Sequence, residues 1–182
     1  FKEFPELILS PDHIKKYGNE FKVLTKALDP ANGVHLHFHW NKEESYHFPN
    51  VIPTGSRDTL FLGIKKGITK EKLIESIKKA IETKDGSNVY ELCNSYNIHL
   101  NSGLHLTPGI YHAPVSLFTI EVQTPHDDYS HIAWDKDWDE NMIKTHLFKG
   151  LFNSVEEVIN ASNFEANLRE DFKKLTTELV KK

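Results

Sequence analysis

The sequence predicts a mainly β fold, an antiparallel β-barrel or jelly roll with flanking helices. Short segments in which apolar and polar residues alternate recur between residues 23 and 123, and turn-forming residues separate them. Two amphipathic patterns, at about 69–96 and 154–181, are typical of helices that pack against a sheet. We therefore expect one domain over residues 1–182, with a helical insertion and a helical C-terminal tail.

Length and composition limit the class further. The 182 residues are 38% hydrophobic, which is enough to bury a core. The net charge of −4 gives no indication of nucleic-acid binding. No apolar stretch approaches the roughly 20 residues that a membrane span needs. No signal peptide is visible, and the single Cys93 fits a reducing compartment, so we expect a cytoplasmic protein. The chain begins at Phe1 rather than Met, so the possibility that it is a piece of a longer protein stays open.

The first half of the chain predicts one short helix and four strands. Ser10-Pro11-Asp12 combines a hydroxyl cap, a proline at the first helical position and an acid, and the helix should stop at Gly18. Strands are expected over 23–28, 34–40, 44–48 and 59–64, with a turn at 29–33.

The second half mixes helices and strands. Thr69 should cap a long amphipathic helix, and a second short helix is expected over 89–96. Strand patterns return over 98–106 and 116–123, with a turn at 107–109 between them. The acidic, aromatic segment 134–139 is either a lid over the barrel mouth or a packed loop, and we expect the loop. A capping box at 154–157 opens the tail, whose apolar stripe continues to Leu179.

The most informative segment is the alternation from Val34 to Trp40. Side chains in a strand alternate between two faces, so His35, His37 and His39 share one face and apolar side chains share the other. His35 lies one step further along than the other two, and we leave it outside the proposed ligand set. The pattern suggests a metal site inside a barrel.

Two further residues complete a candidate ligand set. Glu44 follows His39 by five residues, and its alternation with Tyr46 indicates that it, rather than Glu43, faces inward. His112 follows a Pro-Gly turn on a distant strand. Imidazole and carboxylate donors suit Zn²⁺, Mn²⁺, Fe²⁺ and Ni²⁺, and a site with these ligands keeps room for water or substrate. We predict that a divalent cation binds a set of four residues: His37, His39, Glu44 and His112.

These residues resemble known motifs. His37-x-His39-x4-Glu44 resembles the first motif of the cupin superfamily, whose members are small antiparallel β-barrels that hold a metal in the barrel mouth. Gly103-x4-Pro108-Gly109-x2-His112 resembles the second motif, one residue short before the proline.

A closer resemblance, over roughly residues 4 to 135, is to type I mannose-6-phosphate isomerases. The segment 42–44 is similar to the family's Lys-Thr-Glu, in which the Glu binds zinc and the Lys lies beside the substrate. The segment 108–113 resembles Pro-x-Gly-Thr-x-His-Ala, and 121–123 resembles Glu-Ile-Gln. The family's Gln and His ligands fall on His37 and His39.

The resemblance implies a metal-dependent aldose–ketose isomerase that acts on a sugar or sugar phosphate through an enediol intermediate. It implies zinc as the first choice of metal, with Mn, Fe or Ni as alternatives. Whether the protein forms a homodimer is left open. The implied catalytic candidates are His131, Glu121 and Lys42. His131 takes the place of the family's active-site Arg when the residues are counted from Glu121.

The departures from the family leave other functions open. The Arg is replaced, the long insertion between the histidine strand and Glu44 is missing, and nothing clearly supplies recognition of a phosphate. A sugar-binding or regulatory cupin that kept the metal and lost the chemistry is one alternative. A metal-dependent cupin oxygenase is another, although the isomerase-like motifs argue against it.

Overall fold

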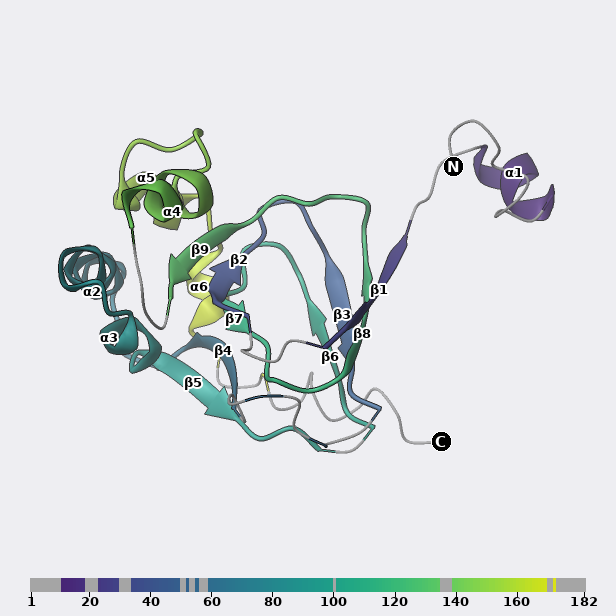
Figure 1. Cartoon of the computed structure of the whole chain (residues 1–182), viewed down its shortest axis with the longest axis horizontal. Coiled ribbons are helices and arrows are strands. Elements are labelled where there is room, and N and C mark those ends of the chain that lie inside the picture. Colours follow the sequence, from purple (N-terminus) through teal and green to yellow (C-terminus); the bar gives the residue numbers. More distant parts are fainter. Residues whose placement is uncertain are drawn as a thin grey trace.

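Two antiparallel sheets face each other in the computed structural model, which describes residues 11–18, 23–29, 34–49, 52, 55, 59–99, 101–134, 139–169 and 172 (Figure 1). The four-stranded sheet has the order β1 (Leu24–Leu28), β8 (Thr119–Gln123), β3 (Glu44–His47) and β6 (Gly103–Leu106). The five-stranded sheet has the order β5 (Cys93–Tyr96), β4 (Leu60–Ile64), β7 (His112–Ala113), β2 (Leu36–Phe38) and β9 (Ser130–Ala133). The predicted antiparallel β-barrel or jelly roll is confirmed.

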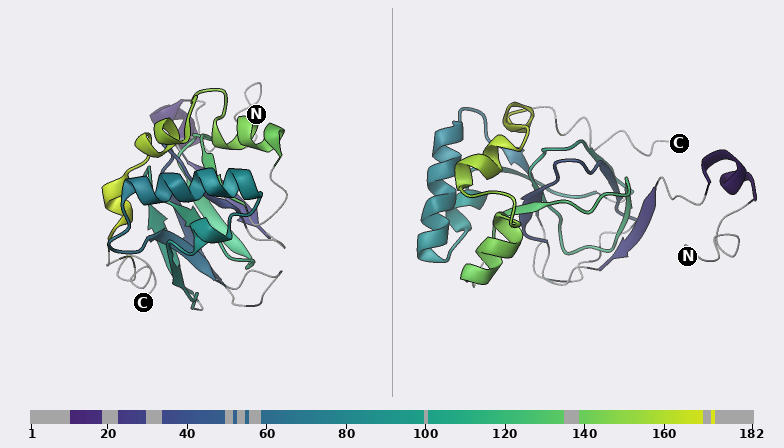
Figure 2. Two further views of the ribbon diagram at one scale, coloured as in Figure 1. Left: turned by 90° about the vertical axis from the view of Figure 1, so that its left-hand side faces the viewer. Right: turned by 90° about the horizontal axis from the view of Figure 1, so that it is seen from above.

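The helices flank this barrel. They are α1 (Pro11–Tyr17), α2 (Lys70–Thr83), α3 (Ser87–Tyr90), α4 (Glu140–Met142), the π-helix η2 (Ile143–Leu147), α5 (Val155–Asn160) and α6 (Phe164–Asn167). Figure 2 shows α2, α3, α4 and α5 gathered on the side of the five-stranded sheet that faces away from the four-stranded sheet. No helix among the described residues is long and apolar enough to cross a bilayer.

Two apolar clusters form the core. One lies between the five-stranded sheet and the helices and joins Leu36 and Phe38 of β2 to side chains of α2 and α5. The other lies between the two sheets and includes Tyr46, Leu62 and Leu104. Because side chains alternate along β2, its apolar residues enter the helical cluster and His37 turns to the barrel interior.

Several local predictions from the sequence are confirmed. Thr69 caps α2 by accepting a hydrogen bond from the Lys72 N–H at 3.2 Å, and Ser154 caps α5 in the same way. Strands β1, β3 and β4 lie within a residue or so of the predicted ranges, and α1 ends just before Gly18. The other three predicted strands are shorter than expected, since β2 covers only 36–38, β6 begins at Gly103 and β8 begins at Thr119.

One helical prediction, the short helix over 89–96, is wrong in its extent. The segment 93–96 is strand β5 rather than helix, because it pairs with β4 from Leu60↔Tyr96 to Ile64↔Cys93, so the helical insertion ends near residue 90. In the described part of the tail Asn163 separates two helices, α5 and α6, and caps α6 by accepting from the Ala166 N–H. Ser10, the turn residues 30–33, the loop residues 135–138 and most of the tail beyond residue 169 lie outside the described residues.

Candidate metal centre

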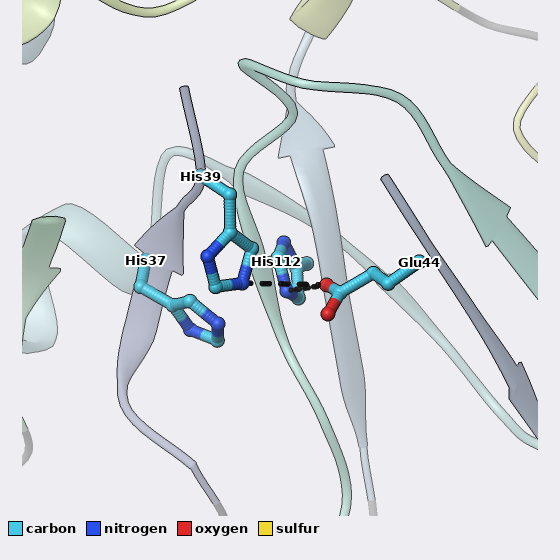
Figure 3. Close-up of side chains that lie close together, drawn as sticks. All are labelled: His37, His39, Glu44 and His112. Atoms are coloured by element: carbon cyan, nitrogen blue, oxygen red, sulfur yellow. Dashed lines mark ion pairs between the residues drawn. The ribbon is translucent and has the colours of Figure 1, made fainter. Parts of the chain in front are cut away.

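The structure brings the four predicted ligands together. One donor atom from each of His37, His39, Glu44 and His112 lies within 4.8 Å of the others, and all four residues are buried. Figure 3 shows the three imidazoles and the Glu44 carboxylate directed toward a common point. His112 Nε2 lies 2.7 Å from Glu44 Oε1, and His39 Nε2 lies 3.5 Å from the same oxygen.

Three strands and one turn produce this convergence. His37 of β2 is the direct partner of His112 on β7, so two imidazoles meet across one sheet. Glu44 opens β3 in the opposite sheet and faces them across the interior. The turn before β7 is joined to the end of β2, because the Gly109 N–H donates to the His39 carbonyl at 2.6 Å.

Gly109 permits this turn in a way that other residues would not. Its φ of +86° lies in the left-handed region, and a Cβ atom there would come within 2.4 Å of the Asn163 backbone nitrogen. The Pro-Gly sequence that predicted the turn therefore has a steric basis.

Each of the three imidazoles is oriented by a hydrogen bond between its Nδ1 atom and a backbone carbonyl oxygen. His37 Nδ1 lies 2.7 Å from the His35 carbonyl oxygen, His112 Nδ1 lies 2.9 Å from the Ile110 carbonyl oxygen, and His39 Nδ1 contacts the Asp128 carbonyl oxygen. A carbonyl can only accept, so each Nδ1 must carry the proton. In a neutral ring the Nε2 lone pair is then left toward the centre, which is the usual arrangement of metal-binding histidines.

Electrostatics also favour a cation at this point. Burial lowers the pKa of His37 well below its ordinary value, and the neighbouring imidazoles lower it further. Burial opposes ionisation of Glu44, yet the facing His112 and His39 hold the pKa of its carboxyl below its ordinary value. The centre therefore presents a carboxylate and imidazole lone pairs to one another at close range. A proton or a cation must lie between them.

The donor set fits a divalent metal. Three imidazole nitrogens and one carboxylate oxygen suit Zn²⁺, Mn²⁺, Fe²⁺ or Ni²⁺. His39 Nε2 is buried and has no hydrogen-bond partner among the described residues, which is costly unless something else binds it.

Two of the three catalytic candidates lie against this centre. Lys42 Nζ is 2.6 Å from Glu44 Oε2 and 2.9 Å from Glu121 Oε1, and both Lys42 and Glu121 are buried. Although burial opposes its charge, the two carboxylates raise the pKa of Lys42. Lys26 of β1 extends the row of charges, with its Nζ 3.7 Å from Glu121 Oε1.

The third candidate, His131, lies beside the centre on β9. It pairs with His37 across β2 and β9, and the two ring centroids are 5.7 Å apart. Burial, together with His35, His146 and Lys149, lowers the pKa of His131 to about 3. His35 is outside the four-residue cluster, and its backbone carbonyl holds His37.

Sequence reasoning missed several supporting residues. Asp128 holds the end of β2, because its Oδ1 accepts from the backbone N–H groups of Trp40 and Asn41 at 2.6 and 3.0 Å. Tyr46 Oη lies 3.5 Å from His112 Nε2, and burial raises the pKa of the Tyr46 phenol. Only the inward register of Tyr46 was readable from the sequence.

The fold and this buried cluster together define a cupin-type barrel with a candidate metal centre. No family model and no curated protein sequence matches the chain. The comparison with solved structures does find matches, and mannose-6-phosphate isomerases are among them.

The enzyme from Bacillus subtilis matches with a TM-score of 0.62 and 16% identity, over 89% of this chain and 50% of that one. A protein from Archaeoglobus fulgidus, provisionally described as a mannosephosphate isomerase, matches with a TM-score of 0.61 and 17% identity, over 93% and 50%. A zinc-bound mannose 6-phosphate isomerase matches with a TM-score of 0.59 and 11% identity, over 99% and 63%. The chain thus spans about half the length of the first two. At these identities the likeness establishes the fold.

Proposed function

We propose that the protein is a metal-dependent aldose–ketose isomerase acting on a sugar or sugar phosphate, through an enediol intermediate. The observation that carries this proposal is the convergence of three oriented imidazoles and one carboxylate inside a barrel. Structures with the same fold are mannose-6-phosphate isomerases, and one of them is described with zinc bound. We therefore propose zinc as the metal.

His37, His39, Glu44 and His112 would hold the cation. When bound, it would act as a Lewis acid toward the carbonyl and hydroxyl oxygens at C1 and C2 of the sugar. The surrounding residues would transfer the proton and hydrogen-bond the substrate.

Glu121 and His131 are the candidate bases for moving the proton between C2 and C1. Glu121 lies near the centre and is oriented by its ion pair with Lys42. Lys42 contacts the carboxylates of both Glu44 and Glu121. Because its ammonium group has three N–H donors, it can also donate a hydrogen bond to a substrate oxygen that gains charge in the transition state.

The test is turnover by the zinc-loaded protein. It is incubated with mannose, lyxose and fructose, and with the 6-phosphates of mannose and fructose, and the partner aldose or ketose is sought. We expect conversion of at least one sugar, its loss in His112→Ala, and its retention in His105→Ala. His105 is a matched control because it is half-exposed and pairs with Glu43 instead of the centre. Bound metal without any turnover would refute the proposal.

A second candidate function is a sugar-binding cupin without catalysis. The identity of residue 131 favours it, because a histidine stands where the resemblance predicts an arginine. Sugar binding without exchange of the C2 proton in deuterated water would identify this function. The cytoplasmic location, the homodimer and the extent of the domain remain predictions from the sequence.

A further inference from the structure

A cluster of three rings, Tyr129, His131 and His146, lies next to the candidate metal centre. His131 and His146 are nearly parallel, with 13° between their planes and 5.3 Å between their centroids. The Tyr129 ring lies 4.8 Å from His131. Tyr129 Oη is 3.0 Å from His146 Nδ1, so a hydrogen bond joins the other two rings. His131 is thereby held between His37 of the candidate centre and the ring of His146.

One of the two ring nitrogens of His131, Nδ1, is buried and has no hydrogen-bond partner within the described part of the chain. Leaving such an atom unpaired is unfavourable, so a partner supplied by a ligand would stabilise it. A neutral imidazole has one donor and one acceptor, which matches the hydroxyl group of a sugar.

The element that carries His146 is unusual. The Phe148 N–H donates to the Ile143 carbonyl at 3.0 Å, which is the wide turn of the π-helix η2. Such turns are rare in proteins, and those that occur are often found at functional sites. In this turn Leu147 is fully buried in the apolar cluster under the helices, while the adjacent His146 stacks on β9.

We propose that His146 is a positioning residue, whose stacked ring holds His131 beside the metal centre so that His131 can hydrogen-bond a hydroxyl or carbonyl oxygen of the sugar. The identity of that ligand rests on the proposed function. The positioning of His131 by His146 does not, because it follows from the ring contacts alone.

Three substitutions separate stacking from hydrogen bonding. His146→Phe keeps a ring that can stack and loses the hydrogen bond to Tyr129, while His146→Asn keeps a hydrogen-bonding group and loses the ring. His146→Ala loses both. Lys144→Ala is the matched control, because Lys144 lies in the same π-helix with its side chain exposed.

Two readouts are taken on the zinc-loaded protein. The first is imidazole NMR of His131, which needs no substrate. We expect one sharp set of His131 signals in the wild type, in His146→Phe and in Lys144→Ala, and broadened or doubled signals in His146→Ala and His146→Asn. The second is kinetics with mannose, lyxose, fructose, mannose 6-phosphate and fructose 6-phosphate. We expect kcat to fall about tenfold in His146→Ala and His146→Asn with little change in KM, and to stay within about threefold in His146→Phe, because misplacing a reacting group mainly lowers kcat.

Sharp His131 signals and unchanged kcat in His146→Ala would overturn the inference. So would an equal loss in His146→Phe, because stacking would then not be what holds His131. If His146→Ala does not fold, His146→Asn decides in its place. If the wild type turns over no sugar, the proposed function fails, and the NMR comparison alone decides whether His146 positions His131.

Discussion

Asn167 offers a demanding test of how the turn that carries His112 is held. Its side chain is fully buried and makes three hydrogen bonds. Asn167 Oδ1 accepts from the Tyr111 N–H at 2.7 Å, and Nδ2 donates to the carbonyls of Gly109 and Asn163, both at 2.8 Å. One side chain from α6 thus fixes the backbone on the N-terminal side of His112. We predict that Asn167→Ala weakens both the fold and the candidate metal centre.

The size of the effect follows from what the substitution leaves unpaired. The Gly109 and Asn163 carbonyls each keep another backbone donor, at 3.2 and 3.3 Å, so each loses roughly 0.5 kcal/mol. The Tyr111 N–H loses its acceptor in a buried position, at a cost of about 1–3 kcal/mol. The sum is about 3 kcal/mol of unfolding free energy. In a chain of this size it corresponds to a fall in Tm of roughly 6–12 °C.

Thermal unfolding and zinc titration measure the two effects. We expect the lower Tm together with zinc binding weakened about tenfold, since residues that orient metal ligands contribute on that scale. Asn160→Ala is the control, because Asn160 is exposed in α5 and its side-chain oxygen accepts a hydrogen bond from the partly exposed Lys70, and it should change stability by less than about 0.5 kcal/mol. A Tm for Asn167→Ala within about 2 °C of the wild type would contradict this reasoning.

Three further outcomes are expected. In elemental analysis, His112→Ala should lose its bound metal, and His105→Ala, altered on the outer face, should keep it; equal metal content would exclude the four-residue centre. Lys42→Ala should lower the unfolding free energy in urea by about 3–5 kcal/mol, because it removes the buried cation that lies closest to the carboxylates of Glu44 and Glu121, and a loss below about 1 kcal/mol would contradict that. Burial raises the pKa of Cys93 to about 12. A raised pKa favours the neutral thiol, so at pH 8 Cys93 should react with a thiol reagent only after denaturation, and rapid labelling of the folded chain would refute this.

Local chemistry made much of the fold predictable. The caps at Thr69 and Ser154 depend on residues within three positions, so the sequence displays them directly. The inward face of β2 was equally readable, because its period of two separates histidines from apolar residues. For the same reason Glu44 could be distinguished from Glu43, which pairs with His105 on the outer face.

Contacts between distant segments were not predictable in the same way. The segment 93–96 becomes a strand through pairing with β4, and short segments of this kind follow their partners more than their own propensity. The bonds from Asp128 to Trp40 and from Asn167 to Tyr111 join residues 88 and 56 positions apart. Asp128 lies in a loop and Asn167 at the end of α6, and neither position has a local pattern that would reveal such a role.

The candidate centre depends on the register of a strand of only three residues. β2 pairs with β7 on one side and β9 on the other, and His37 stands opposite His112 in the first pairing and His131 in the second. A slip of one residue would turn every β2 side chain to the other face, moving His37 into the apolar cluster and Leu36 and Phe38 out of it. Burial of those two side chains therefore protects the register more strongly than any contact between the histidines themselves. The apolar face of β2 is thus as necessary to the centre as the imidazoles are.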